Sequence, residues 1–222
     1  VAGIFGATGQ TCMAGSRLLV QADIYDDVVA AMAERAREVV MGDPLDPATE
    51  MGPVCNTRQL DQILAIIEEA KGAGARLVAG GGRAKGPAVD SGLFIEPTVF
   101  ADVKPTMEIA CREVFGPVVS IIKFKDEAEA VSIANQSDFG LVAGVWTTNV
   151  SRAHRMTKNL EAGTVWVNTY RTSVAQAPAG GTKQSGFGRE RGWHGLLEYM
   201  HVKNVMIDFS DDARDPFSIK TQ

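Results

Sequence analysis

Cysteine and histidine are scarce in this sequence, which holds three of each among 222 residues. The cysteines (Cys12, Cys55 and Cys111) are odd in number and widely spaced, which argues against a framework of disulfide bonds. No pair has the Cys-x-x-Cys spacing of a zinc site and the histidines are scattered, so we expect no bound metal. Unpaired thiols are typical of a reducing compartment, and we expect a cytoplasmic protein.

Long apolar runs and an excess of basic residues are also absent. No run approaches the roughly 18 consecutive apolar residues of a membrane-spanning helix, so we expect no membrane partner. The net charge of −5 would repel phosphates, which argues against nucleic acid as a partner. Neither a Gly-x-Gly-x-x-Gly fingerprint nor a P-loop occurs, so the sequence offers no complete nucleotide-binding loop.

A signal peptide and an initiating methionine are missing as well. The sequence begins with Val1 and enters a glycine-rich stretch, from Gly6 to Gly15, almost at once. Because that stretch has the composition of a functional loop, we expect the chain to be part of a longer protein, with an N-terminal portion that precedes it.

The sequence does contain a regular alternation of strand-like and helix-like segments. The run at 118–122 lacks a polar–apolar alternation, which is typical of a strand covered on both faces. We expect one main domain over 1–189, with a long polar loop at 169–189, and a C-terminal appendage over 190–222. The alternation predicts an α/β fold with a parallel sheet. Strands are expected at 17–21, 76–80, 94–100, 118–124, 141–147, 164–168 and 201–209, and helices at 23–40, 57–71, 126–137, 151–163 and 191–199.

Cys12 is the first candidate for chemistry. It lies between Gly9 and Gly15 among small residues, and such a loop can bring backbone N–H groups close to a ligand. A thiolate beside those donors can attack a carbonyl carbon while the donors stabilise the oxyanion that forms. The alternative is a small buried residue, because free cysteines are often buried and inert. The pattern places no histidine near Cys12, as a cysteine–histidine hydrolase would require.

Glu113 and Phe115 are the second candidates. They stand directly before Gly116 and Pro117, which interrupt the chain ahead of the buried strand. Side chains at a strand entrance are well placed to contact a ligand. The alternative is a solvated glutamate beside a core phenylalanine.

Four stretches, in order, resemble the motifs of the NAD(P)-dependent aldehyde dehydrogenase superfamily. The resemblance covers nearly the whole chain and implies the catalytic, C-terminal portion of such an enzyme. It also implies a C-terminal strand that joins subunits into a homodimer or homotetramer. The stretches are GQTCMAGSR (9–17), EVFGPV (113–118), GTVWVN (163–168) and PAGGTKQSGFGRE (178–190).

The resemblance implies a role for each candidate residue. Cys12 would attack a small aldehyde to give a thiohemiacetal and, after hydride transfer to NAD or NADP, a thioester that water hydrolyses to a carboxylic acid. Glu113 and Phe115 would contact the nicotinamide ribose. The small residues at 173 and 179 replace aromatic ones of many members, which implies a wider pocket. The substrate pocket would include Thr11, Met13, Thr172, Ser173 and Ala179.

The same resemblance implies that the general base and most of the cofactor site lie N-terminal to Cys12, outside this chain. We therefore expect the isolated chain to be inactive. Three alternatives stay open: a cysteine-dependent esterase or acyltransferase, a CoA-acylating dehydrogenase, and an inactive paralogue that serves as an oligomerisation partner.

Overall fold

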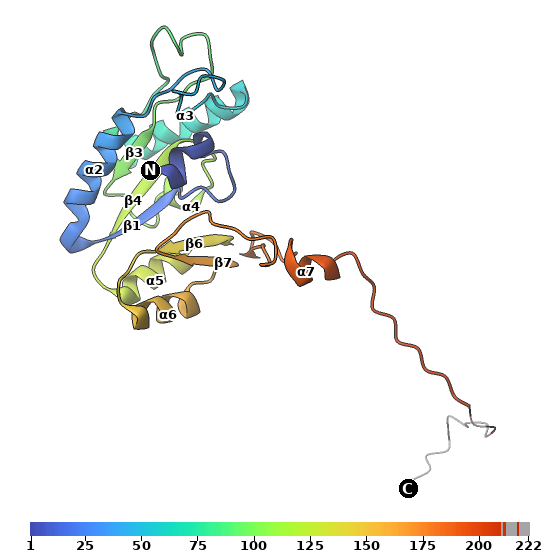
Figure 1. Cartoon of the computed structure of the whole chain (residues 1–222). Coiled ribbons are helices and arrows are strands. Elements are labelled where there is room, and N and C mark those ends of the chain that lie inside the picture. Colours follow the sequence, from blue (N-terminus) through green and yellow to red (C-terminus); the bar gives the residue numbers. More distant parts are fainter. Residues whose placement is uncertain (210, 212–216, 218–222) are drawn as a thin grey trace.

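Four strands form the main sheet of the computed structural model, which describes residues 1–209, 211 and 217 (Figure 1). Their order is β1 (Arg17–Gln21), β4 (Val118–Phe124), β3 (Thr98–Ala101) and β2 (Arg76–Ala79). β4 pairs in parallel with β1 and with β3, whereas β2 is antiparallel to β3. The sheet is therefore mixed, and the prediction of a parallel sheet is wrong for β2. The connection at 80–97 contains no helix, so the chain makes no crossover there and returns in the opposite direction.

Two apolar cores cover the two faces of this sheet. On one face, α3 (Thr57–Gly72) and α4 (Glu108–Cys111) pack against Val118 and Ile122; on the other, α1 (Ala2–Phe5) and α2 (Tyr25–Arg37) pack against Val119 and Ile121. Successive residues of β4 thus enter opposite cores, and its first five residues are all buried. The prediction of a strand covered on both faces is confirmed. Figure 1 shows α2 and α3 on opposite sides of the strands.

A second, smaller part follows β4. α5 (Glu127–Asn135) begins after Asp126, whose side chain accepts a hydrogen bond from the Glu129 amide at 2.9 Å, as a helix cap does. β6 (Val142–Val145) and β7 (Thr164–Val167) pair in parallel through α6 (Val150–Asn159), while β5 (Phe139–Gly140) pairs antiparallel with β8 (Thr182–Lys183). Figure 1 shows this part below the main sheet.

Most predicted elements form, with differences at their ends. The strands expected at 17–21 and 118–124 have the predicted bounds. The strand expected at 94–100 begins only at Thr98, because the preceding proline has no N–H to donate to a ladder. The helix expected at 23–40 starts with a short 3₁₀ turn, η2 (Ala22–Ile24), and ends at Arg37.

The C-terminal appendage consists of α7 (Gly192–Leu197) and an extended segment. Figure 1 shows this segment running away from the rest of the molecule. The strand predicted at 201–209 forms no ladder with any other segment that the structure describes, and its residues are exposed. Its pairing with another subunit stays a prediction. The rest of the predicted tail, at 210, 212–216 and 218–222, lies outside the described residues.

The division into domains at residue 189 stays a prediction as well.

Among the helices that the structure describes, none combines the length and apolar character that a membrane crossing requires.

Candidate active site

The loop that carries Cys12 begins in an unusual backbone conformation. In the short turn η1 (Gly6–Gly9), Ala7, Thr8 and Gly9 have φ values of 56°, 58° and 66°. Residues other than glycine seldom adopt this left-handed conformation, which costs roughly 1–3 kcal/mol at each position. The Thr8 hydroxyl donates to the carbonyl of Gly52 at 3.1 Å. This contact holds the turn against the segment that leads to α3.

Gln10 attaches the same loop to the start of α3. Its Oε1 accepts a hydrogen bond from the backbone N–H of Cys55 at 3.0 Å, and its Nε2 donates to the Cys55 Sγ at 3.1 Å. Further along, the Gln59 Nε2 donates to the carbonyls of Val114 and Phe115, both at 3.1 Å. The beginning of α3 therefore contacts both the cysteine loop and the segment that holds Phe115.

Cys12 stands at the corner of a tight turn. The amide of Ala14 donates to the carbonyl of Thr11 at 2.9 Å, which places Cys12 and Met13 at the two central positions. The thiol is exposed, so it is not a core residue of this chain. Within the part of the chain that the structure describes, the N–H of Cys12 has no hydrogen-bond acceptor. That N–H is free to donate to a ligand.

Gly9 brings the stretch 113–118 into contact with the loop that carries Cys12. A Cβ atom at Gly9 would overlap the carbonyl group of Gly116 and lie 2.9 Å from the nitrogen of Pro117. Gly116 in turn packs against Ile63 of α3, where a side chain would also overlap. Two glycines thus allow the stretches 9–17 and 113–118 to touch through their backbones.

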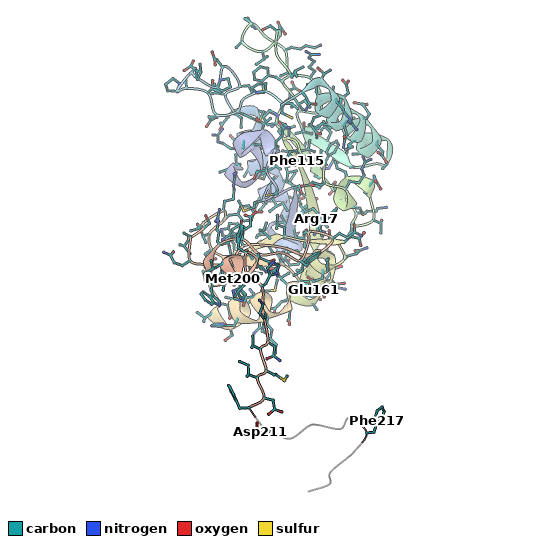
Figure 2. The ribbon with its side chains drawn as sticks, turned by 90° about the vertical axis from the view of Figure 1, so that its right-hand side faces the viewer. Arg17, Phe115, Glu161, Met200, Asp211 and Phe217 are labelled. Atoms are coloured by element: carbon teal, nitrogen blue, oxygen red, sulfur yellow. The ribbon has the colours of Figure 1, made fainter. Side chains whose placement is uncertain are left out.

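The result is a cavity of about 360 Å³ beside Cys12. Its lining includes Thr11, Cys12, Glu113 and Phe115, so the structure brings together the predicted nucleophile, one predicted substrate residue and both predicted cofactor residues. Figure 2 shows Arg17 between Phe115, on the side of the main sheet, and Glu161, on the side of the smaller part. Other polar residues of the lining are Ser16, Arg17, Cys111, Arg112, Asn135, Ser137, Glu161, Gln184 and Ser185.

Glu113 and Phe115 present free groups to this cavity. Neither is a core residue: Phe115 is 36% exposed and has a φ of 51°. The Glu113 carboxylate has no hydrogen bond or ion pair to any residue in 1–209, so its oxygens are free to accept bonds from hydroxyl groups. A carboxylate, an aromatic ring and a thiol therefore line the same cavity.

Arg17 is a cavity residue that sequence reasoning missed. Its guanidinium donates to the carbonyls of Ile133 at 3.2 Å and Ala134 at 3.1 Å, near the end of α5. Burial lowers the pKa of Arg17, and the nearby Cys111 thiol opposes that shift. The side chain thereby connects β1 with the smaller part across the cavity. No sequence signal marks it, because its partners are backbone carbonyls.

The other predicted substrate residues do not line this cavity, and their role in substrate binding stays a prediction. The carbonyl of Thr172 accepts a bond from the Trp166 Nε1 at 2.8 Å. Ala179 and Glu190 exchange two backbone hydrogen bonds of 2.7 Å each. The residues outside the cavity lining are Met13, Thr172, Ser173 and Ala179.

Tyr170 and Arg171, both missed in the sequence, connect this second loop to the cysteine loop. The Tyr170 ring lies over Gly3, 3.1 Å from a Cβ built there, and packs edge-on against Trp166 at a centroid distance of 4.9 Å. Burial raises the pKa of Tyr170. Arg171 lies against Gly6, with one guanidinium nitrogen 3.1 Å from the Cβ position. The loop after β7 therefore contacts the turn that precedes Cys12.

The stretches 163–168 and 178–190 also touch each other through glycines. A Cβ atom at Gly163 would overlap the carbonyl of Gly180.

Residues 1–209, 211 and 217 contain no group of three or more His, Cys, Asp or Glu side chains that is arranged to hold a metal ion.

The sequence matches known proteins along nearly its whole length. The model of the aldehyde dehydrogenase family matches residues 1–205. Betaine aldehyde dehydrogenase of Sinorhizobium fredii is 48% identical over 205 residues, and that of Brucella ovis is 46% identical over 206 residues. These matches cover 92% and 93% of this chain but 42% of each relative, so the chain spans less than half of their length.

Solved structures share the fold. A variant of betaine aldehyde dehydrogenase from Staphylococcus aureus, in complex with NAD+, has a TM-score of 0.95 at 40% identity, over 97% of this chain and 44% of that chain. The NAD+ complex of aldehyde dehydrogenase from Bacillus cereus has a TM-score of 0.90 at 43% identity, over 94% and 42%. On the family match and on these relatives, this chain belongs to the aldehyde dehydrogenase family.

Proposed function

We propose that this chain supplies the nucleophile and part of the cofactor site for the NAD-dependent oxidation of an aldehyde to a carboxylic acid. The observation that carries the proposal is the backbone contact of Gly9 with Gly116, which seats an exposed Cys12 beside Glu113 and Phe115 in one cavity. Both of the solved structures described above are complexes with NAD+, which favours NAD as the cofactor.

Cys12 would act first. Its deprotonated sulfur attacks the carbonyl carbon of the aldehyde, a C–S bond forms, and the π electron pair of the carbonyl moves to oxygen. The free N–H of Cys12 donates to that oxyanion and stabilises it. The sp³ carbon that results bears a hydrogen, an oxyanion and sulfur, and from such a carbon hydride departs readily. Water then hydrolyses the thioester on Cys12 and releases the acid.

Glu113 and Phe115 would position the cofactor. The carboxylate of Glu113 accepts hydrogen bonds from a pair of ribose hydroxyls, and the exposed ring of Phe115 packs beside them. NAD+, when bound, supplies the hydride acceptor. These two residues make one wall only, and the sequence contains no dinucleotide-binding fingerprint. We therefore propose that the isolated chain oxidises no aldehyde.

Partners and location complete the proposal. Betaine aldehyde is one candidate substrate, because the similar proteins carry that name. The segment 201–209 would pair with a second copy of the chain in a homodimer or homotetramer. The three free, exposed thiols suit a reducing cytoplasm.

Competitive alkylation tests the role of Cys12. All three cysteines are exposed, so exposure alone gives none of them an advantage. With iodoacetamide below one equivalent, we expect mass spectrometry to find the adduct on Cys12 before Cys55 or Cys111. Faster labelling of either of the other thiols would refute the proposal. Acid release from an activated ester by the chain without cofactor would instead favour an esterase.

A further inference from the structure

Arg171 places a positive charge against the loop that carries the nucleophile. One guanidinium nitrogen lies 3.1 Å from the Cβ position of Gly6, at the start of the turn Gly6–Gly9 that leads to Cys12. The neighbouring Tyr170 packs on Gly3 of α1, which precedes the loop, and on Gly15 near its end. The segment 170–171 therefore holds the guanidinium beside this loop.

The absence of a side chain at Gly6 permits this arrangement. A Cβ atom 3.1 Å from the nitrogen would be tighter than ordinary van der Waals contact, so a methyl group would require the guanidinium to shift by a few tenths of an ångström. Arg171 itself has a φ of 61°, an uncommon conformation for a residue with a long side chain. The backbone thus fixes the direction in which this side chain leaves the loop.

The Arg171 guanidinium has no hydrogen-bonding or ion-pair partner among the described residues. Its side chain is half-buried, yet it makes no ion pair or hydrogen bond to any residue in 1–209. The two arginines in the cavity lining are engaged: Arg17 with two carbonyls of α5, and Arg112 with Glu108 at 3.4 Å. A half-buried guanidinium without a partner favours an anionic ligand, because it binds carboxylates through paired N–H donors.

We infer that the substrate is an aldehyde that carries a carboxylate, which Arg171 binds while Cys12 attacks the carbonyl. This inference rests on the proposed function and names the substrate class of the same site. A cationic aldehyde such as betaine aldehyde is disfavoured by the same charge. The carboxylate would lie on the side of the cysteine loop that faces the segment 170–171, away from Glu113.

Two alkylating reagents of equal reach test this charge on the chain itself. Iodoacetate is anionic and iodoacetamide is neutral; in both cases the Cys12 sulfur forms a C–S bond as iodide leaves. The rate with iodoacetate divided by the rate with iodoacetamide, both measured at Cys12, therefore reports the charge near the thiol. We expect Arg171→Gln to lower the ratio by about two- to fivefold at low salt, the size of a partly exposed charge pair. Added salt should diminish the difference.

Matched variants separate Arg171 from a general charge effect. Arg171→Lys keeps the charge and should keep most of the ratio. Arg83→Gln removes an exposed arginine that does not line the cavity, and it should leave the ratio unchanged. An unchanged ratio in Arg171→Gln, or an equal fall in Arg83→Gln, overturns the inference.

The absolute rates distinguish this failure from failure of the proposed function. Normal iodoacetamide reactivity of Cys12 with an unchanged ratio leaves the nucleophile in place and removes only the anionic substrate. If Cys12 reacts more slowly than Cys55 and Cys111 with both reagents, the proposed function is refuted, and the substrate inference with it.

Discussion

The α-carbon of Gly9 lies so close to the carbonyl of Gly116 that no side chain fits between them. Through this contact the turn before Cys12 and the segment of Glu113 and Phe115 become two walls of one cavity. The position of the thiol relative to the carboxylate is therefore set by backbone packing. It does not depend on any bond made by Cys12 itself.

Alanine at Gly9 should disrupt this arrangement. The added methyl group overlaps the Gly116 carbonyl, and the φ of 66° is unfavourable for alanine. We expect Gly9→Ala to lower the free energy of unfolding by about 2–4 kcal/mol and to slow alkylation of Cys12. Gly188→Ala is the matched control, since a Cβ at Gly188 meets no atom within 4 Å. Urea titrations measure the first effect; equal stability of the two variants would contradict the overlap.

The contact of Gln10 with Cys55 allows a graded test. Gln10→Ala removes both of its hydrogen bonds, whereas Cys55→Ala keeps the backbone N–H from which Gln10 accepts and removes two weak bonds to sulfur, one from Gln10 and one from Asn56. We expect a loss of about 0.5–1.5 kcal/mol for Gln10→Ala and a smaller one for Cys55→Ala. The alkylation rate of Cys12 should change in the same order. A larger effect from Cys55→Ala would show that the amide contact does not hold the loop.

Glu127 predicts a pH dependence of stability. Its carboxylate accepts bonds from Arg155 at 2.7 and 2.8 Å and from Arg152 at 3.3 Å, and these partners lower its pKa from 4.5 to about 2. A lowered pKa means that the folded chain binds the proton less readily than the unfolded chain. The stabilisation is therefore present above pH 4.5 and disappears as the pH falls toward about 2.

The measurement compares the chain with Glu127→Gln by denaturant unfolding across this range. We expect the difference in stability to be constant near neutral pH and to narrow between pH 4.5 and about 2. Arg155→Gln should show the same narrowing, because it removes the main partner. A difference that does not vary with pH would contradict the role of this ion pair.

The exposed segment 201–209 predicts association between copies of the chain. Val202, Val205 and Ile207 are all exposed, and an apolar extended segment without a ladder is a surface for strand pairing. We expect light scattering to find a monomer after deletion of residues 201–222, and an oligomer for the intact chain. Val205→Lys with Ile207→Lys should act like the deletion, while Lys203→Gln should not. An oligomer that survives the deletion would place the interface elsewhere.

Local signals account for the elements that the sequence predicts well. The strand at 118–124 follows a Gly-Pro break and is apolar on both faces, and Asp126 caps the next helix in the expected way. The direction of β2 was mispredicted, because a short apolar segment is the same in parallel and antiparallel pairs. The left-handed turn at Ala7 and Thr8 carries no sequence signal either, since neither residue type favours it.

The residues of the site also divide into those that the sequence predicts and those that it does not. Cys12, Glu113 and Phe115 stand in distinctive stretches, and the structure places them in one cavity. Arg171 could not be predicted, because its position depends on contact with Gly6 at the other end of the chain. Such contacts depend on how the smaller part packs against the main sheet, and a periodic pattern holds no information about that packing.

The contact between Gly9 and Gly116 also has a consequence for the order of events on the ribosome. Synthesis runs from the N-terminus, so Cys12 emerges long before Gly116, the residue against which its loop packs. β1, directly after the loop, cannot yet pair either, because its one ladder partner in the described sheet is β4. A nascent chain that stops short of β4 therefore exposes a thiol whose loop has no fixed shape. Its reactivity toward an alkylating reagent would report the moment at which the sheet closes during synthesis.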